Sequence, residues 1–174
     1  MDHGPYSRIL VPLDGSVHAE RALPVAAHIA RQSGGTIILV RAVPLAPSFG
    51  ALEGGFVVSE ASEDVACERA SAYLARIARE PVLAELHTDR IATVGAAVEV
   101  ILAAAHQADL IVIASHKPSR LPRWLRPSVA ESVARQARCP VMIVRKEIQA
   151  PSSAITICSM TNGARQSQHK EPAL

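Results

Sequence analysis

The chain is predicted to fold as an α/β domain whose parallel sheet is covered by helices on both faces. Four short runs rich in Val, Ile and Leu alternate along the sequence with segments of helical periodicity, and this order is typical of parallel sheets with helical crossovers. The composition agrees, because 49% of the 174 residues are hydrophobic and only 3% are aromatic. The core is therefore expected to be aliphatic, and the length fits one domain with a remainder.

The first predicted unit is a strand, a helix and a second strand. Arg8 to Leu13 is an apolar run that ends in an Asp-Gly-Ser turn, which predicts a buried strand. Helical spacing begins after Ser16, and Pro24 inside the segment should bend the helix or tighten a turn. Thr36 to Val43 is nearly continuous in β-branched residues, which predicts a strand buried on both faces.

The middle of the chain predicts a loop, a long helix and an edge strand. Pro44 to Val58 is rich in Pro and Gly and has no period, so we expect a loop. Glu60 to Glu80 is predicted to be a helix that ends before Pro81. One face of this helix should carry its apolar residues: Ala66, Ala70, Tyr73, Leu74 and Ile77. Val82 to Thr93 alternates poorly and is polar, which favours an edge strand.

The last predicted unit repeats the pattern of helix and strand. A helix should open at Gly95, and Asp109 to Ala114 should form a buried strand. The helix is expected to present one apolar stripe: Val98, Ile101, Leu102 and Ala105. A proline-containing loop is expected over Ser115 to Pro127, a helix over Ser128 to Arg138, and a final strand over Pro140 to Val144.

The predicted domain occupies residues 8–146. Residues 1–7 are interpreted as an N-terminal extension, and residues 147–174 turn polar and are expected to form a mostly disordered tail. The three cysteines are widely spaced without a CxxC pair, which argues against a disulfide scaffold and suits a reducing compartment. With no signal-like or membrane-length apolar run, the expected location is the cytoplasm.

The net charge and the spacing of chemically active side chains also narrow the classes of function that the chain could have. A net charge of +2 is small for a nucleic-acid-binding protein. The seven histidines form no HxH or HxxxH pair, so no metal site is predicted. No GxSxG motif or recognisable Cys/His pair is present, and we predict no catalytic residues.

In a doubly wound parallel sheet, ligands bind beyond the carboxyl ends of the strands, where the winding reverses direction. Candidate site residues should therefore follow strands directly. Three segments do so: Asp14–Ser16, Ala42–Pro44 and Ala114–Ser128.

At these segments the chain resembles the universal stress proteins of the UspA type. The resemblance lies in ILVPLDGS with the following AERALPVAAHIA, in DLIVIASH, in SRLPRWL and in SVAESVARQARCPVMIVR, and it spans about Arg8 to Arg145. It implies a five-stranded sheet in the order 3-2-1-4-5. It also implies that a bound nucleotide would meet these positions: Leu13, Asp14, Ala42, Ala114, His116, Lys117, Arg120, Arg123, Ser128 and Val129.

ATP-binding members of that family carry a loop of the form Gly-x2-Gly-x9-Gly-Ser/Thr. Its glycines would fall at Ala114, Lys117 and Pro127 in this chain, and Ser128 alone matches. Such a loop needs glycine so that backbone N–H groups approach phosphate closely, and proline has no N–H to donate. We therefore expect no cofactor, with ATP or AMP plus magnesium as the alternative.

Two candidate residues also have local structural interpretations. Asp14 could bind ligand, or its carboxylate could cap N–H groups of its own turn. Ser128 begins an S-x-x-E sequence, which predicts a capping box with Glu131 at the start of a helix. Leu13 and Ala42 could equally belong to the core at the end of the sheet.

The loop from Lys117 to Arg126 is strongly basic. It holds four cations and no acid, twice the net charge of the chain. It could bind an anion, an acidic protein or a phosphorylated metabolite, or it could simply be solvated. Trp124 in this loop is expected to anchor it by packing.

The chain is predicted to form a homodimer through its final strand. Pro140 to Arg145 is apolar and lies at the edge of the expected sheet, and an unpaired edge favours pairing with a second copy; the tail could cover it instead. The resulting hypothesis is a non-catalytic, dimeric regulatory module of the stress response with no membrane partner. The alternatives are a nucleotide-binding switch with weak ATPase activity, and an anion or phosphometabolite sensor.

Overall fold

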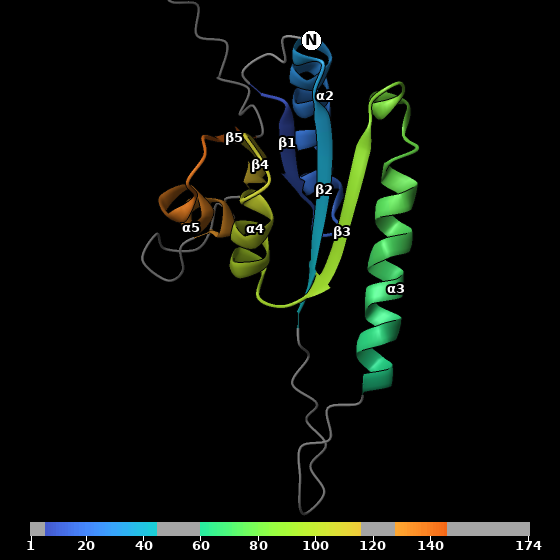
Figure 1. Ribbon diagram of the computed structural model, residues 1–174. Helices are drawn as coiled ribbons and strands as arrows, with labels where there is room; N and C mark the ends of the chain where they lie inside the picture. The colour runs from blue at the N-terminus through green and yellow to red at the C-terminus, as the bar shows by residue number, and fades with distance from the viewer. Residues whose placement is uncertain (1–5, 45–59, 116–127, 146–174) are drawn as a thin grey trace, which may run out of the picture.

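The computed structural model describes residues 6–44, 60–115 and 128–145. These form one parallel sheet of five strands in the order β3-β2-β1-β4-β5, so the predicted fold class and strand order are confirmed (Figure 1). The strands are β1 (Arg8–Pro12), β2 (Thr36–Val43), β3 (Thr88–Val94), β4 (Leu110–Ser115) and β5 (Val141–Arg145). The basic loop and the tail, with their predictions, lie outside the described residues.

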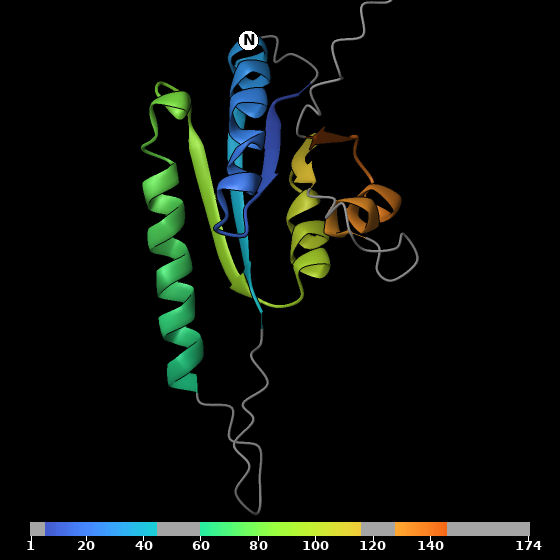
Figure 2. The same ribbon diagram turned by 180° about the vertical axis from the view of Figure 1, so that it is seen from behind.

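Helices cover both faces of the sheet (Figures 1 and 2). The helices are α1 (Val17–Glu20), α2 (Ala22–Ser33), α3 (Glu60–Ile77), α4 (Ala97–Ala105) and α5 (Val129–Gln136), with a 3-10 turn η1 at Pro81–Leu83. The first three helices lie on one face, and α4 and α5 lie on the other. No helix of the described segments combines the length and the apolar character needed to cross a bilayer.

Side chains of the central strands alternate between two cores. Ile37 and Leu39 point into the core under α2 and α3, whereas Ile38 and Val40 point into the core under α4 and α5. All four are at most 1% exposed. Because both faces are covered, the strand sequence shows no polar alternation, which explains its continuous apolar run.

The helix predicted after Ser16 is divided into α1 and α2 at Arg21. Pro24 lies in the first turn of α2 and has no N–H to donate to the residue four positions before it. Of the two predicted effects of Pro24, a bend or a tightened turn, the structure shows the turn, in which the N–H of Arg21 donates to the carbonyl of His18 at 3.3 Å. In α2, the alanines at 22, 26 and 30 are fully buried and let the helix lie close to the sheet.

Two predicted boundaries and one predicted stripe were wrong; the first boundary is that of the edge strand, which begins at Thr88 rather than Val82. Helix α3 ends at Ile77 rather than Glu80, because η1 follows and Pro81 starts that turn. In α4 the buried residues are Val100, Ile101 and Ala104, and the other expected stripe residues are only partly buried. The reason is that α4 packs against both the sheet and α5, so its apolar arc is broader than one stripe.

Candidate functional site

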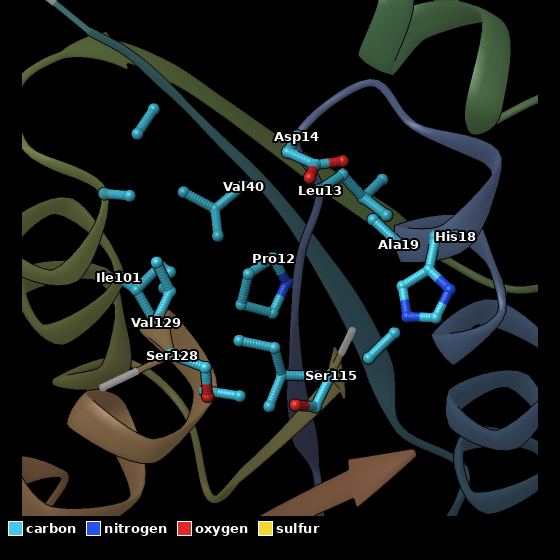
Figure 3. A pocket seen from close by; sticks show the side chains of 15 residues that line it. Pro12, Leu13, Asp14, His18, Ala19, Val40, Ile101, Ser115, Ser128 and Val129 are labelled. Carbon is cyan, nitrogen blue, oxygen red and sulfur yellow. The ribbon is translucent and has the colours of Figure 1, made fainter. Parts of the chain in front are cut away.

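A cavity of about 240 Å³ lies at the carboxyl edge of the sheet. Its walls come from the ends of β1, β2 and β4 and from the first turns of α1, α4 and α5 (Figure 3). Strand β1 pairs with β2 on one side and with β4 on the other, so the winding reverses between β1 and β4. The cavity therefore occupies the switch point at which doubly wound sheets bind ligands.

The walls are mainly apolar, with a few polar groups around them. Pro12 and Val40 lie near the middle of the close view and Ile101 lies to the left of them, while the polar residues Asp14, His18, Ser115 and Ser128 lie around Pro12 (Figure 3). This combination of apolar surface and a few oriented polar groups is typical of small-molecule sites. The volume enclosed by the described residues is just below the usual range of roughly 300–1,000 Å³ for small-molecule sites.

The structure brings six of the ten predicted positions together around this cavity: Leu13, Asp14, Ala42, Ala114, Ser128 and Val129. The other four lie outside the described residues: His116, Lys117, Arg120 and Arg123. Leu13 is only 4% exposed, and its N–H donates to the carbonyl of Val40 at 2.8 Å. It therefore belongs to the core as well as to the cavity wall.

Asp14 stabilises its own turn. Its Oδ1 accepts from the N–H of Ser16 at 2.8 Å, while the Ser16 hydroxyl accepts from the N–H of Ala19 at 3.1 Å and caps α1. Partial burial raises the pKa of Asp14. The hydrogen bonds donated by Ser16, together with the electrostatic attraction of the nearby His18, outweigh this effect and hold the pKa below its usual value. The turn therefore holds the carboxylate of Asp14 in place at the cavity and favours its ionised form.

Ser128 is the N-cap of α5, as the S-x-x-E sequence predicts. Its backbone is extended (φ −65°, ψ 152°), and its hydroxyl oxygen accepts from the N–H of Glu131 at 3.2 Å. One acceptor position of this hydroxyl is therefore used by the helix itself. The cap also fixes the first turn of α5 at the edge of the cavity.

Removing this cap gives a first testable prediction. Ser128→Ala should lower the free energy of unfolding by about 1 kcal/mol, because one N–H at the start of α5 loses its acceptor. Urea denaturation followed by circular dichroism measures the change. Ser132→Ala, in the same helix but without a capping role, should change stability by less than about 0.5 kcal/mol. Equal losses in the two variants would show that the cap is not the cause.

His18 and Ser115 also line the cavity but are not among the ten predicted positions, although Ser115 lies in the candidate segment Ala114–Ser128. Ser115 is 7% exposed and ends β4, and its hydroxyl lies beside the cavity (Figure 3). His18 belongs to α1 and presents its imidazole to the same space. Only their positions in the sequence could have indicated that they line the cavity, since each lies at or just beyond the carboxyl end of a strand at the switch point.

The described part of the chain contains no group of three or more His, Cys, Asp or Glu side chains that could hold a metal ion. Cys139 is partly buried, and burial raises the pKa of its thiol above the usual value. A raised pKa lowers the thiolate fraction at neutral pH and so makes this cysteine a poor nucleophile.

Fold and site together define a doubly wound α/β domain with a ligand-sized cavity at its switch point. The model of the universal stress protein family matches residues 5–145, and the chain belongs to that family. The chain is 32% identical over 143 residues to universal stress protein MJ0531 of Methanocaldococcus jannaschii. That match covers 81% of this chain and 83% of the relative.

Solved structures show the same relationship. Hypothetical protein MJ0577, the subject of a structure-based assignment of biochemical function, superposes with a TM-score of 0.64 at 26% identity. The match covers 82% of this chain and 97% of MJ0577. A universal stress protein in complex with cAMP shares the fold, with a TM-score of 0.54 at 24% identity over 80% of this chain and 97% of that one.

Proposed function

We propose that this chain is a non-catalytic regulatory module of the stress response that binds an adenine mononucleotide in the cavity at the switch point. The cavity itself is the observation that carries the proposal. It is apolar enough for a base, and it is bordered by the carboxylate of Asp14 and the hydroxyl of Ser115. Such groups can orient the hydroxyls of a ribose through hydrogen bonds.

Two features favour a mononucleotide over ATP with magnesium. Ala114 places a methyl group in the cavity wall, and Pro127 has no backbone N–H for a phosphate oxygen. The N–H of Glu131 already donates to the Ser128 hydroxyl at 3.2 Å, so this N–H is not free for a phosphate oxygen. We therefore propose that the phosphate-binding loop of the ATP-binding members is degenerate in this chain and that a triphosphate lacks the backbone donors that the glycines would allow.

Binding without turnover is supported by the state of Asp14. A general base works best when its pKa lies near the working pH. The pKa of Asp14 is instead held below its usual value by the hydrogen bonds of its turn. Its carboxylate is therefore a weak base, suited to holding a ligand rather than to activating water.

The proposed unit is residues 8–146, assembled as a homodimer through β5. This strand ends the described sheet on one side, and its Met142 is 41% exposed. An apolar strand with an unpaired edge is a template for a second copy. The extension at residues 1–7 and the tail at 147–174 are proposed to lie outside this unit, and the proposed location is the cytoplasm.

Calorimetry with AMP, cAMP and magnesium–ATP tests the proposed ligand. AMP should bind, and magnesium–ATP should bind no more tightly than AMP. Ala97→Phe should weaken AMP binding by at least about 100-fold, or about 2.7 kcal/mol, because Ala97 lines the cavity from the exposed first residue of α4. Ala103→Phe, at an exposed position of the same helix outside the cavity, is the matched control and should bind as the unmodified chain does.

Each other result has a definite meaning. Tighter binding of magnesium–ATP than of AMP, with release of phosphate, would replace the proposal with the nucleotide switch. Failure of all three nucleotides to bind would remove the adenine ligand and leave the anion-sensor hypothesis, which the basic loop would have to carry.

A further inference from the structure

One wall of the cavity is carried by a single short segment, residues 14–20. Asp14, His18 and Ala19 face the cavity from this segment. The segment comprises the turn at Gly15 and the four-residue helix α1, in which only Ala19 is buried. So short a piece of chain has little stability of its own, so its position must be set by what lies behind it.

Arg41 lies directly behind the turn. It belongs to β2 and, because strand side chains alternate, it points to the face opposite the cavity residues Val40 and Ala42. A Cβ added to Gly15 would lie 2.9 Å from Nη2 and 3.1 Å from Cζ of Arg41. The guanidinium therefore packs against the backbone of Gly15, whose φ of +91° already favours glycine.

Tyr73 of α3 holds this guanidinium in turn. The Cζ of Arg41 lies 4.7 Å from the centre of the Tyr73 ring, and that of Arg76 lies 5.3 Å from it. A planar guanidinium stacks well on an aromatic face, which a lysine ammonium cannot copy. Among the described residues, no carboxylate lies within ion-pair distance of Arg41. Its guanidinium is therefore held by its contacts with Tyr73 and Gly15.

The far end of the segment is attached to the same tyrosine. The hydroxyl of Tyr73 donates to Oε1 of Glu20, the last residue of α1, at 3.0 Å. Arg76 donates to the same oxygen at 3.2 Å. Burial and the bond to Glu20 raise the pKa of Tyr73 far above its usual value, so its hydroxyl keeps the donated proton across the physiological range.

We propose that Arg41 is a positioning residue for ligand binding: stacked on Tyr73 and packed against Gly15, it fixes the turn that carries Asp14 into the cavity wall. The inference rests on the proposed function for its ligand. It assigns α3, which does not line the cavity, a part in shaping it through Tyr73. Removing the guanidinium should loosen the turn while leaving both cores intact.

Three variants test this inference: Arg41→Lys, Arg41→Gln and Arg69→Gln. Both Arg41 variants should weaken AMP binding about tenfold and raise the pKa of Asp14, measured by NMR titration of its carboxyl carbon, because the bond from Ser16 loosens. The amide of Ser16 should also exchange with solvent faster. Arg69→Gln removes an exposed cation of the same helix that neither stacks on Tyr73 nor contacts segment 14–20, and it should change neither quantity.

Comparing the three variants separates the positioning role of Arg41 from the effect of its charge and from a general weakening of the fold. If Arg41→Lys behaves like the unmodified protein, the charge of Arg41 suffices and the inference is overturned. If Arg69→Gln matches Arg41→Gln, the effect comes from losing any cation near α3, and the inference fails too. If the unmodified protein binds no AMP, the proposed function fails, while the pKa of Asp14 and the exchange of Ser16 still decide the role of Arg41.

Discussion

Replacing Leu39 with alanine is expected to cost about 2–5 kcal/mol of stability, the largest loss of any prediction made for this chain. Leu39 lies in the middle of β2, is 0% exposed and belongs to the core under α2 and α3. Its neighbours in that core include Ile37 and Leu74, which are equally buried. The sheet on one side and the helices on the other leave little room to collapse, so a cavity should remain.

Chemical denaturation at several wavelengths measures this loss. The midpoint should fall while the dependence of stability on denaturant stays constant, as expected when the native and unfolded states keep their surface areas. Val65→Ala is the control, because Val65 lies on α3 and is 44% exposed, and the change should stay within about 0.5 kcal/mol. A loss below about 1 kcal/mol for Leu39→Ala would show that the core around β2 repacks.

Met142→Asp is expected to convert the proposed dimer into monomers. Met142 is 41% exposed on the edge strand β5. Pairing of β5 with a second copy would bring two such carboxylates close together in an apolar interface, where like charges are costly. Ile143 is less suitable for this test, because it packs against the core under α4 and α5 and its loss would also weaken the fold.

Sedimentation velocity at matched concentrations shows the outcome. The unmodified chain should sediment as a dimer and Met142→Asp as a monomer with an unchanged circular dichroism spectrum. Val65→Asp places the same charge at a similarly exposed apolar position on α3 and should remain dimeric. A Met142→Asp protein that is still a dimer would place the interface elsewhere, and a monomeric unmodified chain would remove the dimer altogether.

The strands could be predicted from the sequence because burial on both faces leaves a strong local pattern. Thr36 to Val43 was predicted with the bounds that β2 has in the structure. The weaker pattern of Val82 to Thr93 has a physical cause. Its first residues form η1, and β3 is an edge strand whose side chains are only partly buried, so its sequence alternates less clearly. The strand order itself depends on long-range pairing, and it came from the family resemblance.

The site was less accessible to prediction from sequence. Asp14 and Ser128 could be found because turns and caps have short-range signatures. Ser115 could be found only as part of the segment Ala114–Ser128, and His18 could not be found, since nothing local distinguishes a histidine facing a cavity from one facing solvent. Arg41 was hidden for a different reason. Its role depends on contacts with Gly15 and Tyr73, which lie 26 and 32 positions away along the chain.

The break at Arg21 has a consequence for the evolution of the family. It separates α1, which forms part of the cavity, from α2, whose five buried residues help to hold the core together. Substitutions of His18 can therefore alter the wall of the cavity without disturbing the interior, since His18 lines the cavity and Ala19 is the buried residue of α1. Exchange of this one side chain offers a route from one ligand to another while the scaffold stays constant.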